Sequence, residues 1–138
     1  MKYTALAHWE GSLKKGKGSL STQSGALKNA AYSWKSRFEE GQEGTNPEEL
    51  LAATHAGCFT MAVCSHLTKK GYDPAELDTK ATVTMTDLTI TSVHLSITGK
   101  VKDLTEDEFK EVTNYEGKHC IISKALKVQI DTDARLVA

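Results

Sequence analysis

The segment TNPEELLAATHAGCFTMAVC, residues 45–64, predicts one long helix and constrains the fold more than any other part of the chain. Asn46 is a favourable N-cap, Pro47 suits the first helical position, and Glu49 follows the cap by three residues. Gly71 is the expected end of the helix, because glycine readily adopts the left-handed conformation that follows a helix C-terminus. So long an apolar helix must be covered by other parts of the protein.

Short strands and two further helices are expected around this long helix. The first forty residues predict three strands, and two alternating segments later in the chain predict an antiparallel pair, each strand with one buried face. Thr105 and Glu108 form a capping box that opens a second helix. The expected strands are 2–9, 18–22, 31–38, 81–88, 91–101 and 127–137, and the further helices are 104–112 and 120–126. This order predicts a single α+β domain over residues 1–138.

Composition narrows the function classes. The chain has 138 residues, of which 39% are hydrophobic and 25% charged, with a formal net charge of -1. No basic field points to nucleic acid, and no apolar run approaches the roughly 20 residues of a membrane span. The first residues lack the apolar centre of a secretory signal, so a cytoplasmic location is expected. Exposed strand edges and the long apolar helix favour a dimer.

The three cysteines, Cys58, Cys64 and Cys120, are too few and too widely spaced for a disulfide framework. In a reducing compartment such residues are buried side chains, metal ligands or reactive thiols. At about 100° per residue, Cys64 lies about 120° from Cys58 around the helix, so Cys64 is expected in the core. Small residues precede Cys58 and keep its surroundings open, but spacing alone leaves reactive and structural roles equally open.

Two charged residues could act near Cys58. Glu48 falls within the same quadrant of the helix as Cys58, and the helix cap does not need it, since Glu49 fills that role. Both carboxylates also suit the positive end of the helix dipole. Arg37 is expected at the end of a strand, just before the loop that leads into the helix. It is either a surface residue or a cation that favours a thiolate at Cys58.

Nucleotide and metal sites are less consistent with the sequence. The segment GSLKKGKGS resembles a phosphate-binding loop, but Gly18 stands where serine or threonine must meet Mg²⁺, and a strand is expected next. Five histidines accompany the three cysteines, but no pair has the short spacing of a zinc site. His55 and Cys58, three residues apart, could form half of one. A structural zinc therefore stays open as an alternative.

Three further segments are informative together: AHWEGSLKKGKGSLSTQSGAL, SRFEEGQEGTNPEELLAATHAGCF and HCIISKALK. They closely resemble the OsmC/Ohr family, the osmotically inducible and organic hydroperoxide resistance proteins. The resemblance covers essentially the whole chain, and its most specific part is the N-P-E-E-L…A-x-C motif. The first segment is similar to the OsmC branch rather than the Ohr branch.

The resemblance implies a thiol-dependent peroxidase that needs no cofactor or metal. Cys58 matches the peroxidatic cysteine, Cys120 the resolving cysteine, and Arg37 and Glu48 the residues that orient the active site. It also implies an OsmC-like fold with two small antiparallel sheets around long central helices. The expected assembly is an intertwined homodimer with two active sites at its interface. The family usually has proline after the resolving cysteine, where this chain has Ile121.

The implied mechanism begins with attack of a Cys58 thiolate on hydrogen peroxide or an organic hydroperoxide, which leaves a sulfenic acid. Arg37 would favour the thiolate and donate hydrogen bonds to the peroxide, while Glu48 holds its guanidinium. Cys120 would then form a disulfide, which a dithiol, such as a lipoyl group, reduces. The alternative is a dimeric module of the same fold that binds a small apolar molecule without catalysis.

Overall fold

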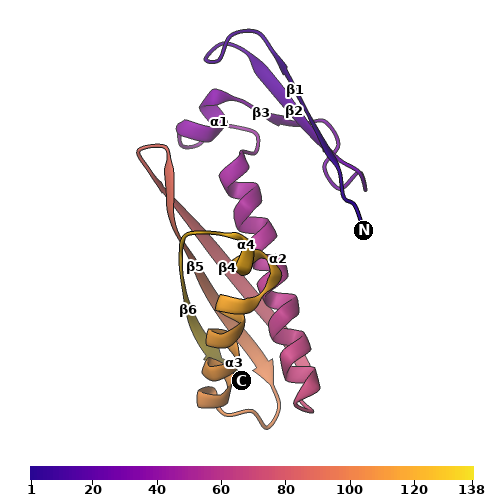
Figure 1. The fold of residues 1–138 in the computed structure, drawn as a ribbon, viewed down its shortest axis with the longest axis vertical. Helices are drawn as coiled ribbons and strands as arrows, with labels where there is room; N and C mark the ends of the chain where they lie inside the picture. Colours follow the sequence, from indigo (N-terminus) through magenta and orange to yellow (C-terminus); the bar gives the residue numbers. More distant parts are fainter. The chain divides into compact units, whose positions relative to one another are not determined.

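The computed structural model describes residues 1–138. They form two compact units, Met1–Leu50 and Leu51–Ala138. The division falls inside the long helix, and each unit is described by itself. The elements are β1 (Ala5–Glu10), β2 (Lys17–Thr22), β3 (Ala30–Tyr32), α1 (Trp34–Phe38), α2 (Pro47–Lys69), β4 (Pro74–Thr86), β5 (Thr89–Val101), α3 (Glu106–His119), α4 (Ile121–Ala125) and β6 (Gln129–Leu136) (Figure 1). The α+β class and the order of the strands are confirmed.

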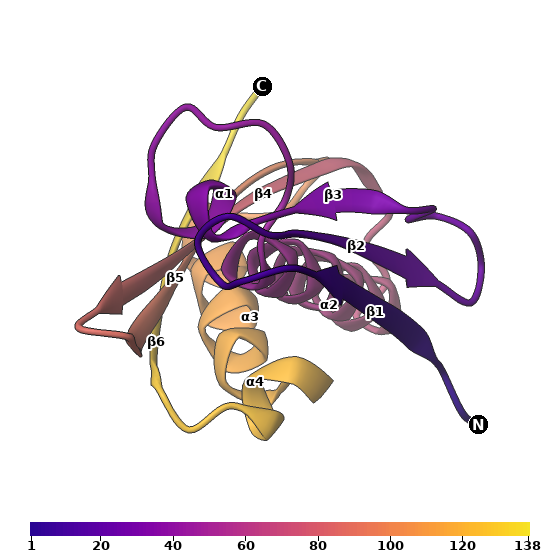
Figure 2. The same ribbon diagram turned by 90° about the horizontal axis from the view of Figure 1, so that it is seen from above.

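The N-terminal unit is built on an antiparallel sheet in which β2 lies between β1 and β3 (Figure 2). Trp9 and Tyr32 meet edge to face across this sheet, with ring centroids 5.5 Å apart. Gly18 leaves room for the two rings, because a Cβ at this position would lie 2.5 Å from the Tyr32 ring and 2.6 Å from the Trp9 ring. The glycine that ruled out a phosphate-binding loop therefore serves the packing of two aromatic rings.

The third strand is shorter than expected, and the prediction of a strand over 31–38 is wrong for most of its length. The strand ends at Tyr32, and Trp34–Phe38 form the short helix α1. Ser33 causes the change, because its hydroxyl accepts from the Ser36 backbone N–H while the Ser36 hydroxyl accepts from the Ser33 N–H. This reciprocal cap favours a helix over a continuing strand.

The long helix begins as predicted. The Asn46 side-chain oxygen accepts from the Glu49 backbone N–H at 2.8 Å, and Pro47 is the first helical residue. Gly71 has φ +92 just beyond the last turn, as a helix C-terminus requires. The helix has 23 residues and a window of mean hydropathy 1.3, of which 22% is buried. By length and composition alone it passes the test for a membrane-spanning helix, a test that the core helix of a globular protein also passes.

The C-terminal unit is built on a second three-stranded sheet with β5 at its centre. The pair β4–β5 is antiparallel as predicted, whereas β6 runs parallel to β5, so this sheet is mixed rather than wholly antiparallel. The parallel pairing follows from the connection, because α3 and α4 carry the chain back along the sheet before β6 begins. The expectation of two small sheets is confirmed, with this change in one pairing.

Helices α2 and α3 supply the core of the C-terminal unit together with alternate residues of β5. Thr105 and Glu108 form the predicted capping box at the start of α3. The buried stripe of α2 repeats every fourth residue, as an amphipathic helix requires. The largest fully buried apolar side chains are Phe59, Phe109, Leu67, Leu95, Ile97, Val63, Val93 and Val112.

Gly117 allows α3 to approach the sheet closely, and this contact yields a stability prediction. A Cβ at this position would lie 2.4 Å from Thr132 Cγ2, a branched side chain close to the β6 backbone. We expect Gly117→Ala to lower the free energy of unfolding by about 1–2 kcal/mol, since the overlap outweighs the better helix propensity of alanine. Chemical denaturation measures this, with Lys118→Ala on the exposed neighbour as control. Equal midpoints for the two variants would contradict the packing argument.

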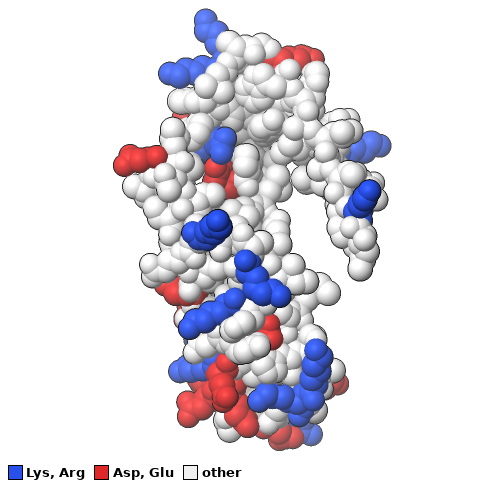
Figure 3. Space-filling view, in the orientation of Figure 1, with Lys and Arg blue, Asp and Glu red and all other residues white.

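Lysine, arginine, aspartate and glutamate are mixed over the surface of the C-terminal unit in Figure 3, and no broad patch of one sign forms on the face shown. Short-range ion pairs contribute to this mixture. Lys100 pairs with Glu76 at 3.2 Å across β4 and β5, and Lys110 pairs with Glu106 at 3.8 Å along α3. Surface pairs of this kind add little stability.

Candidate active site

Arg37 and Glu48 form a two-pronged ion pair in the N-terminal unit. The Arg37 Nη2 donates to Glu48 Oε1 at 2.6 Å, and Nε donates to both carboxylate oxygens at 3.0 and 3.1 Å. Arg37 lies on α1 and Glu48 in the first turn of α2. Arg37 is therefore on a helix and not at the end of the predicted strand, but it still precedes the loop that leads into α2. Such charge-assisted, bidentate bonds fix the plane of a guanidinium.

The neighbouring carboxylate makes a different contact. Glu49 Oε2 accepts from the Thr45 hydroxyl at 2.7 Å, while its backbone N–H is the one that Asn46 caps. The two adjacent glutamates therefore have different partners at the start of α2. Glu49 stabilises the start of α2, and Glu48 holds Arg37.

Cys58 and Cys120 meet in the C-terminal unit. Cys58 is half-buried on α2, and Cys120 is buried at the junction between α3 and α4. Both are free thiols. Both thiols line the same cavity, and the neighbouring Cys120 is one of the causes that raise the pKa of Cys58. The structure thus brings together the two cysteines that the family resemblance pairs.

The pKa of Cys58 is raised from its ordinary value, chiefly because the sulfur is partly buried. Backbone N–H groups of Ile122 and Ile121 donate toward the sulfur and act in the opposite direction. All these groups belong to the C-terminal unit. Within this unit the thiol form of Cys58 is therefore favoured, and a thiolate at neutral pH needs an additional positive charge.

Ile121 occupies the position where the family usually has proline, and it is the first residue of α4. Proline is common at a first helical position, and other residues are accepted there as well. Ile121 retains a backbone N–H that proline lacks, and this N–H is one of the two that donate toward Cys58. The departure from the family pattern adds a hydrogen-bond donor beside the sulfur.

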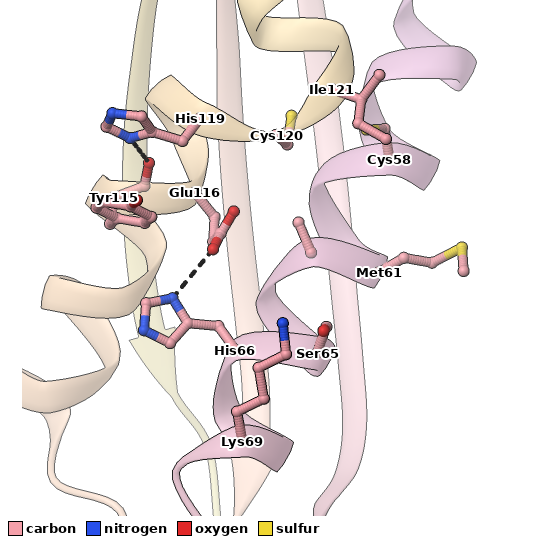
Figure 4. A pocket seen from close by; sticks show the side chains of 11 residues that line it. Cys58, Met61, Ser65, His66, Lys69, Tyr115, Glu116, His119, Cys120 and Ile121 are labelled. Atoms are coloured by element: carbon pink, nitrogen blue, oxygen red, sulfur yellow. Dashed lines mark hydrogen bonds and ion pairs between the residues drawn. The ribbon is translucent and has the colours of Figure 1, made fainter.

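A cavity of about 760 Å³ opens beside Cys58 between α2 and α3 (Figure 4). Its wall combines apolar side chains with a hydrogen bond between His66 Nδ1 and Glu116 Oε1, 3.1 Å apart. The Tyr115 and His119 rings stack on this side of α3, with centroids 4.1 Å apart. The cavity is large enough for a small organic molecule, and Cys58 and Cys120 both line it.

His55 and Ser123 connect by hydrogen bonds to Cys120, which lines this cavity. His55 Nε2 lies 2.7 Å from Ser123 Oγ, which lies 3.1 Å from Cys120 Sγ. The sequence indicates His55 only as a possible half of a zinc site, and it does not point to Ser123. No local spacing points to this contact, because His55 and Ser123 lie 68 residues apart in the sequence.

Cys64 does not fill the core, and that prediction is wrong. It is exposed on α2, while the buried stripe of the helix runs through Phe59, Val63 and Leu67. Met61 is also 76% exposed on this helix. Cys64 falls off the buried stripe because the unit covers one side of the helix only.

No group of three or more histidine, cysteine, aspartate or glutamate side chains in the chain is arranged to hold a metal ion. His55 and Cys58, expected as a possible half of a zinc site, belong to no such group. Instead the His55 ring bonds to Ser123. The structure therefore gives no support to the zinc alternative.

Comparisons with known proteins agree with this arrangement of elements. A sequence model of the family described as OsmC-like protein matches residues 40–135. The chain is 39% identical over 134 residues to "Peroxiredoxin OsmC" of Escherichia coli (strain K12), covering 94% of this chain and 93% of that protein. It is 33% identical over 101 residues to "Organic hydroperoxide resistance protein OhrB" of Bacillus subtilis (strain 168), covering 71% and 74%.

Solved structures share the fold at low sequence identity. The OsmC-like protein from Mycoplasma pneumoniae superimposes with a TM-score of 0.76 at 16% identity, covering 100% of this chain and 99% of that one. The Bacillus subtilis OhrB structure gives 0.67 at 24% identity, covering 97% and 98%. The fold defines an α+β protein of the OsmC/Ohr type. The chain belongs to the OsmC-like protein family.

Proposed function

We propose that the protein is a cysteine-based peroxidase that reduces organic hydroperoxides and hydrogen peroxide. The observation that carries this proposal is the placement of Cys58 and Cys120, two neighbouring free thiols, on the wall of one cavity. A peroxide-detoxifying role also agrees with the names of its relatives, peroxiredoxin OsmC and organic hydroperoxide resistance protein. The reaction needs two thiols and a dithiol, and no metal or organic cofactor.

In the proposed reaction, the Cys58 thiolate attacks one peroxide oxygen and the O–O bond breaks. The departing alkoxide or hydroxide takes a proton, and Cys58 is left as a sulfenic acid. Cys120 then attacks the Cys58 sulfur, a disulfide forms, and water leaves. A dithiol of the lipoyl class would return both cysteines to thiols by two exchange steps.

Arg37 is proposed to supply the positive charge that Cys58 needs. Burial raises the pKa of the Cys58 thiol, whereas a guanidinium near the sulfur lowers it. Arg37 keeps its charge at every physiological pH, and Glu48 holds two of its nitrogens. Nη1 makes no hydrogen bond within the chain, which leaves donors for a peroxide oxygen.

We further propose that the protein acts as a homodimer whose two active sites lie at the interface. The supporting observation is the exposed apolar side of α2, where only 22% of its most apolar window is buried. Met61 and Cys64 lie exposed on this helix. A second copy of the chain would cover this surface. Separately, the absence of a secretory signal pattern in the first residues favours a cytoplasmic location. Light scattering of the purified protein measures the mass.

A change at Glu48 separates its proposed role from that of its neighbour. We expect Glu48→Gln to lower kcat/KM for a hydroperoxide by about 10–100-fold, because the neutral amide cannot hold the guanidinium through two charged oxygens. Glu49→Gln is the matched control, since Glu49 contacts Thr45 instead, and should stay within about twofold. Similar losses in both variants would indicate damage to the helix terminus rather than loss of Arg37 orientation.

The direct test of the proposed activity is peroxide consumption by the purified protein with a small dithiol. Cumene hydroperoxide and hydrogen peroxide are compared under the same conditions. Turnover with either substrate supports a peroxidase, and the ratio of the two rates defines the preferred peroxide class. Absence of turnover, with Cys58 unmodified by either peroxide in mass spectrometry, would instead favour the non-catalytic module that binds a small apolar molecule.

A further inference from the structure

Two buried, consecutive hydrogen bonds lead from His55 through Ser123 to the Cys120 sulfur. The reaction described above does not use them. His55 comes from α2 and Ser123 from α4, and their side chains join across 68 residues of sequence. His55 is 0%, Cys120 3% and Ser123 5% exposed. The contacts run from His55 Nε2 to Ser123 Oγ at 2.7 Å, and from Ser123 Oγ to Cys120 Sγ at 3.1 Å.

The surroundings of His55 determine its protonation. Burial lowers the pKa of the imidazole from its ordinary value, so the ring is neutral and carries one N–H. Its Nδ1 is buried and has no hydrogen-bond partner. A proton on Nδ1 would be a buried N–H without an acceptor, which proteins avoid. The proton therefore lies on Nε2 and is donated to Ser123 Oγ.

This assignment fixes the direction of donation in the two hydrogen bonds, from His55 to Ser123 and from Ser123 to Cys120. Because Ser123 Oγ accepts from His55, the hydroxyl hydrogen is free to donate to the Cys120 sulfur. Each bond polarises the next, so the donation to sulfur is stronger than that of an isolated serine. A donor of this kind stabilises negative charge on sulfur and fixes the direction in which the sulfur lies.

We infer that His55 and Ser123 are positioning residues for Cys120 in disulfide formation, an inference that rests on the proposed function. As the Cys120 sulfur bonds to the sulfur of the Cys58 sulfenic acid, the S–O bond breaks and its electron pair leaves with the oxygen. The proton lost by Cys120 ends on that oxygen, which leaves as water. His55 keeps its single proton and, through Ser123, stabilises the charge that develops on the attacking sulfur.

A purely structural role would not require these residue types. The site is enclosed by apolar core residues, and an apolar side chain would avoid the cost of the unpartnered Nδ1. The histidine is therefore unfavourable for packing alone. Its one hydrogen-bonded nitrogen is directed at the serine that contacts Cys120, which is where a positioning group for this sulfur must act.

The test separates the two chemical steps by rapid mixing. We expect Ser123→Ala to leave the rate of Cys58 oxidation by cumene hydroperoxide within about twofold, and to slow Cys58–Cys120 disulfide formation by about 10–100-fold. Ser92→Ala on β5 is the matched control, since Ser92 makes no side-chain hydrogen bond, and should leave both rates unchanged. A wild-type rate of disulfide formation in Ser123→Ala would overturn the inference.

His55 variants distinguish positioning from packing. His55→Leu removes the donor and should slow disulfide formation as Ser123→Ala does, with the fold retained by circular dichroism. His55→Gln can place an amide N–H near Ser123 and should recover part of the rate. If both variants slow Cys58 oxidation and disulfide formation equally, or if glutamine gives no recovery over leucine, the role of His55 is packing and the inference is wrong.

A second oxidant separates this inference from the proposed function. Diamide converts Cys58 to an adduct that Cys120 can displace, so it forms the same disulfide without peroxide. If peroxide fails and diamide still forms the disulfide more slowly in Ser123→Ala, the peroxidase proposal fails and the positioning role stands. If neither oxidant links Cys58 to Cys120 in the wild-type protein, the positioning role is also wrong.

Discussion

Replacing Cys58 with serine will reduce hydroperoxide turnover by about 1,000-fold or more, the scale of loss when a covalent nucleophile is removed. Serine is nearly the same size and fits the half-buried site on α2, so the fold is retained. Its hydroxyl does not ionise at neutral pH, and peroxide does not oxidise it, so neither the thiolate nor the sulfenic acid can form. Peroxide consumption with excess dithiol measures the loss.

Cys64→Ser is the internal control for this result. Cys64 is exposed on the same helix and would react with general thiol reagents. The account predicts turnover within about twofold of wild type for this variant. If turnover survives in Cys58→Ser and disappears in Cys64→Ser, the reactive thiol is Cys64 and the proposed mechanism is wrong.

Cys120→Ser will separate the first turnover from the catalytic cycle. The variant should reduce about one equivalent of hydroperoxide per chain and stop with Cys58 as a sulfenic acid, which a dimedone label detects. Steady-state turnover should fall by about 100-fold, because an external dithiol at millimolar concentration replaces a sulfur held beside Cys58. Unchanged cycling with the dithiol would show that Cys120 does not resolve the intermediate.

Local patterns in the sequence predicted the helices at the centre of the site. Asn46, Pro47 and Glu49 defined the start of α2, and the Thr105 capping box defined the start of α3. These features depend on neighbouring residues, so they can be read without the fold. The family resemblance paired Cys58 with Cys120, and the structure places these thiols together.

One error arose because a local cap was hidden by a strand-like alternation, and the others arose where the surrounding fold decides the outcome. The alternation after Ala31 was typical of a strand, but the cap between Ser33 and Ser36 forms a helix instead. Cys64 was placed in the core by its angle alone, although the C-terminal unit covers only one side of α2. The bond from His55 to Ser123 spans 68 residues, and no local spacing predicts it.

The most direct test of the redox pair is peptide mass spectrometry after one equivalent of cumene hydroperoxide is added to the reduced wild-type protein. The account predicts a Cys58–Cys120 disulfide within one chain, with Cys64 still a thiol. Non-reducing electrophoresis confirms that the disulfide does not join two chains. Oxidation at Cys64 alone, or a Cys58 that stays reduced while peroxide remains, would contradict the account.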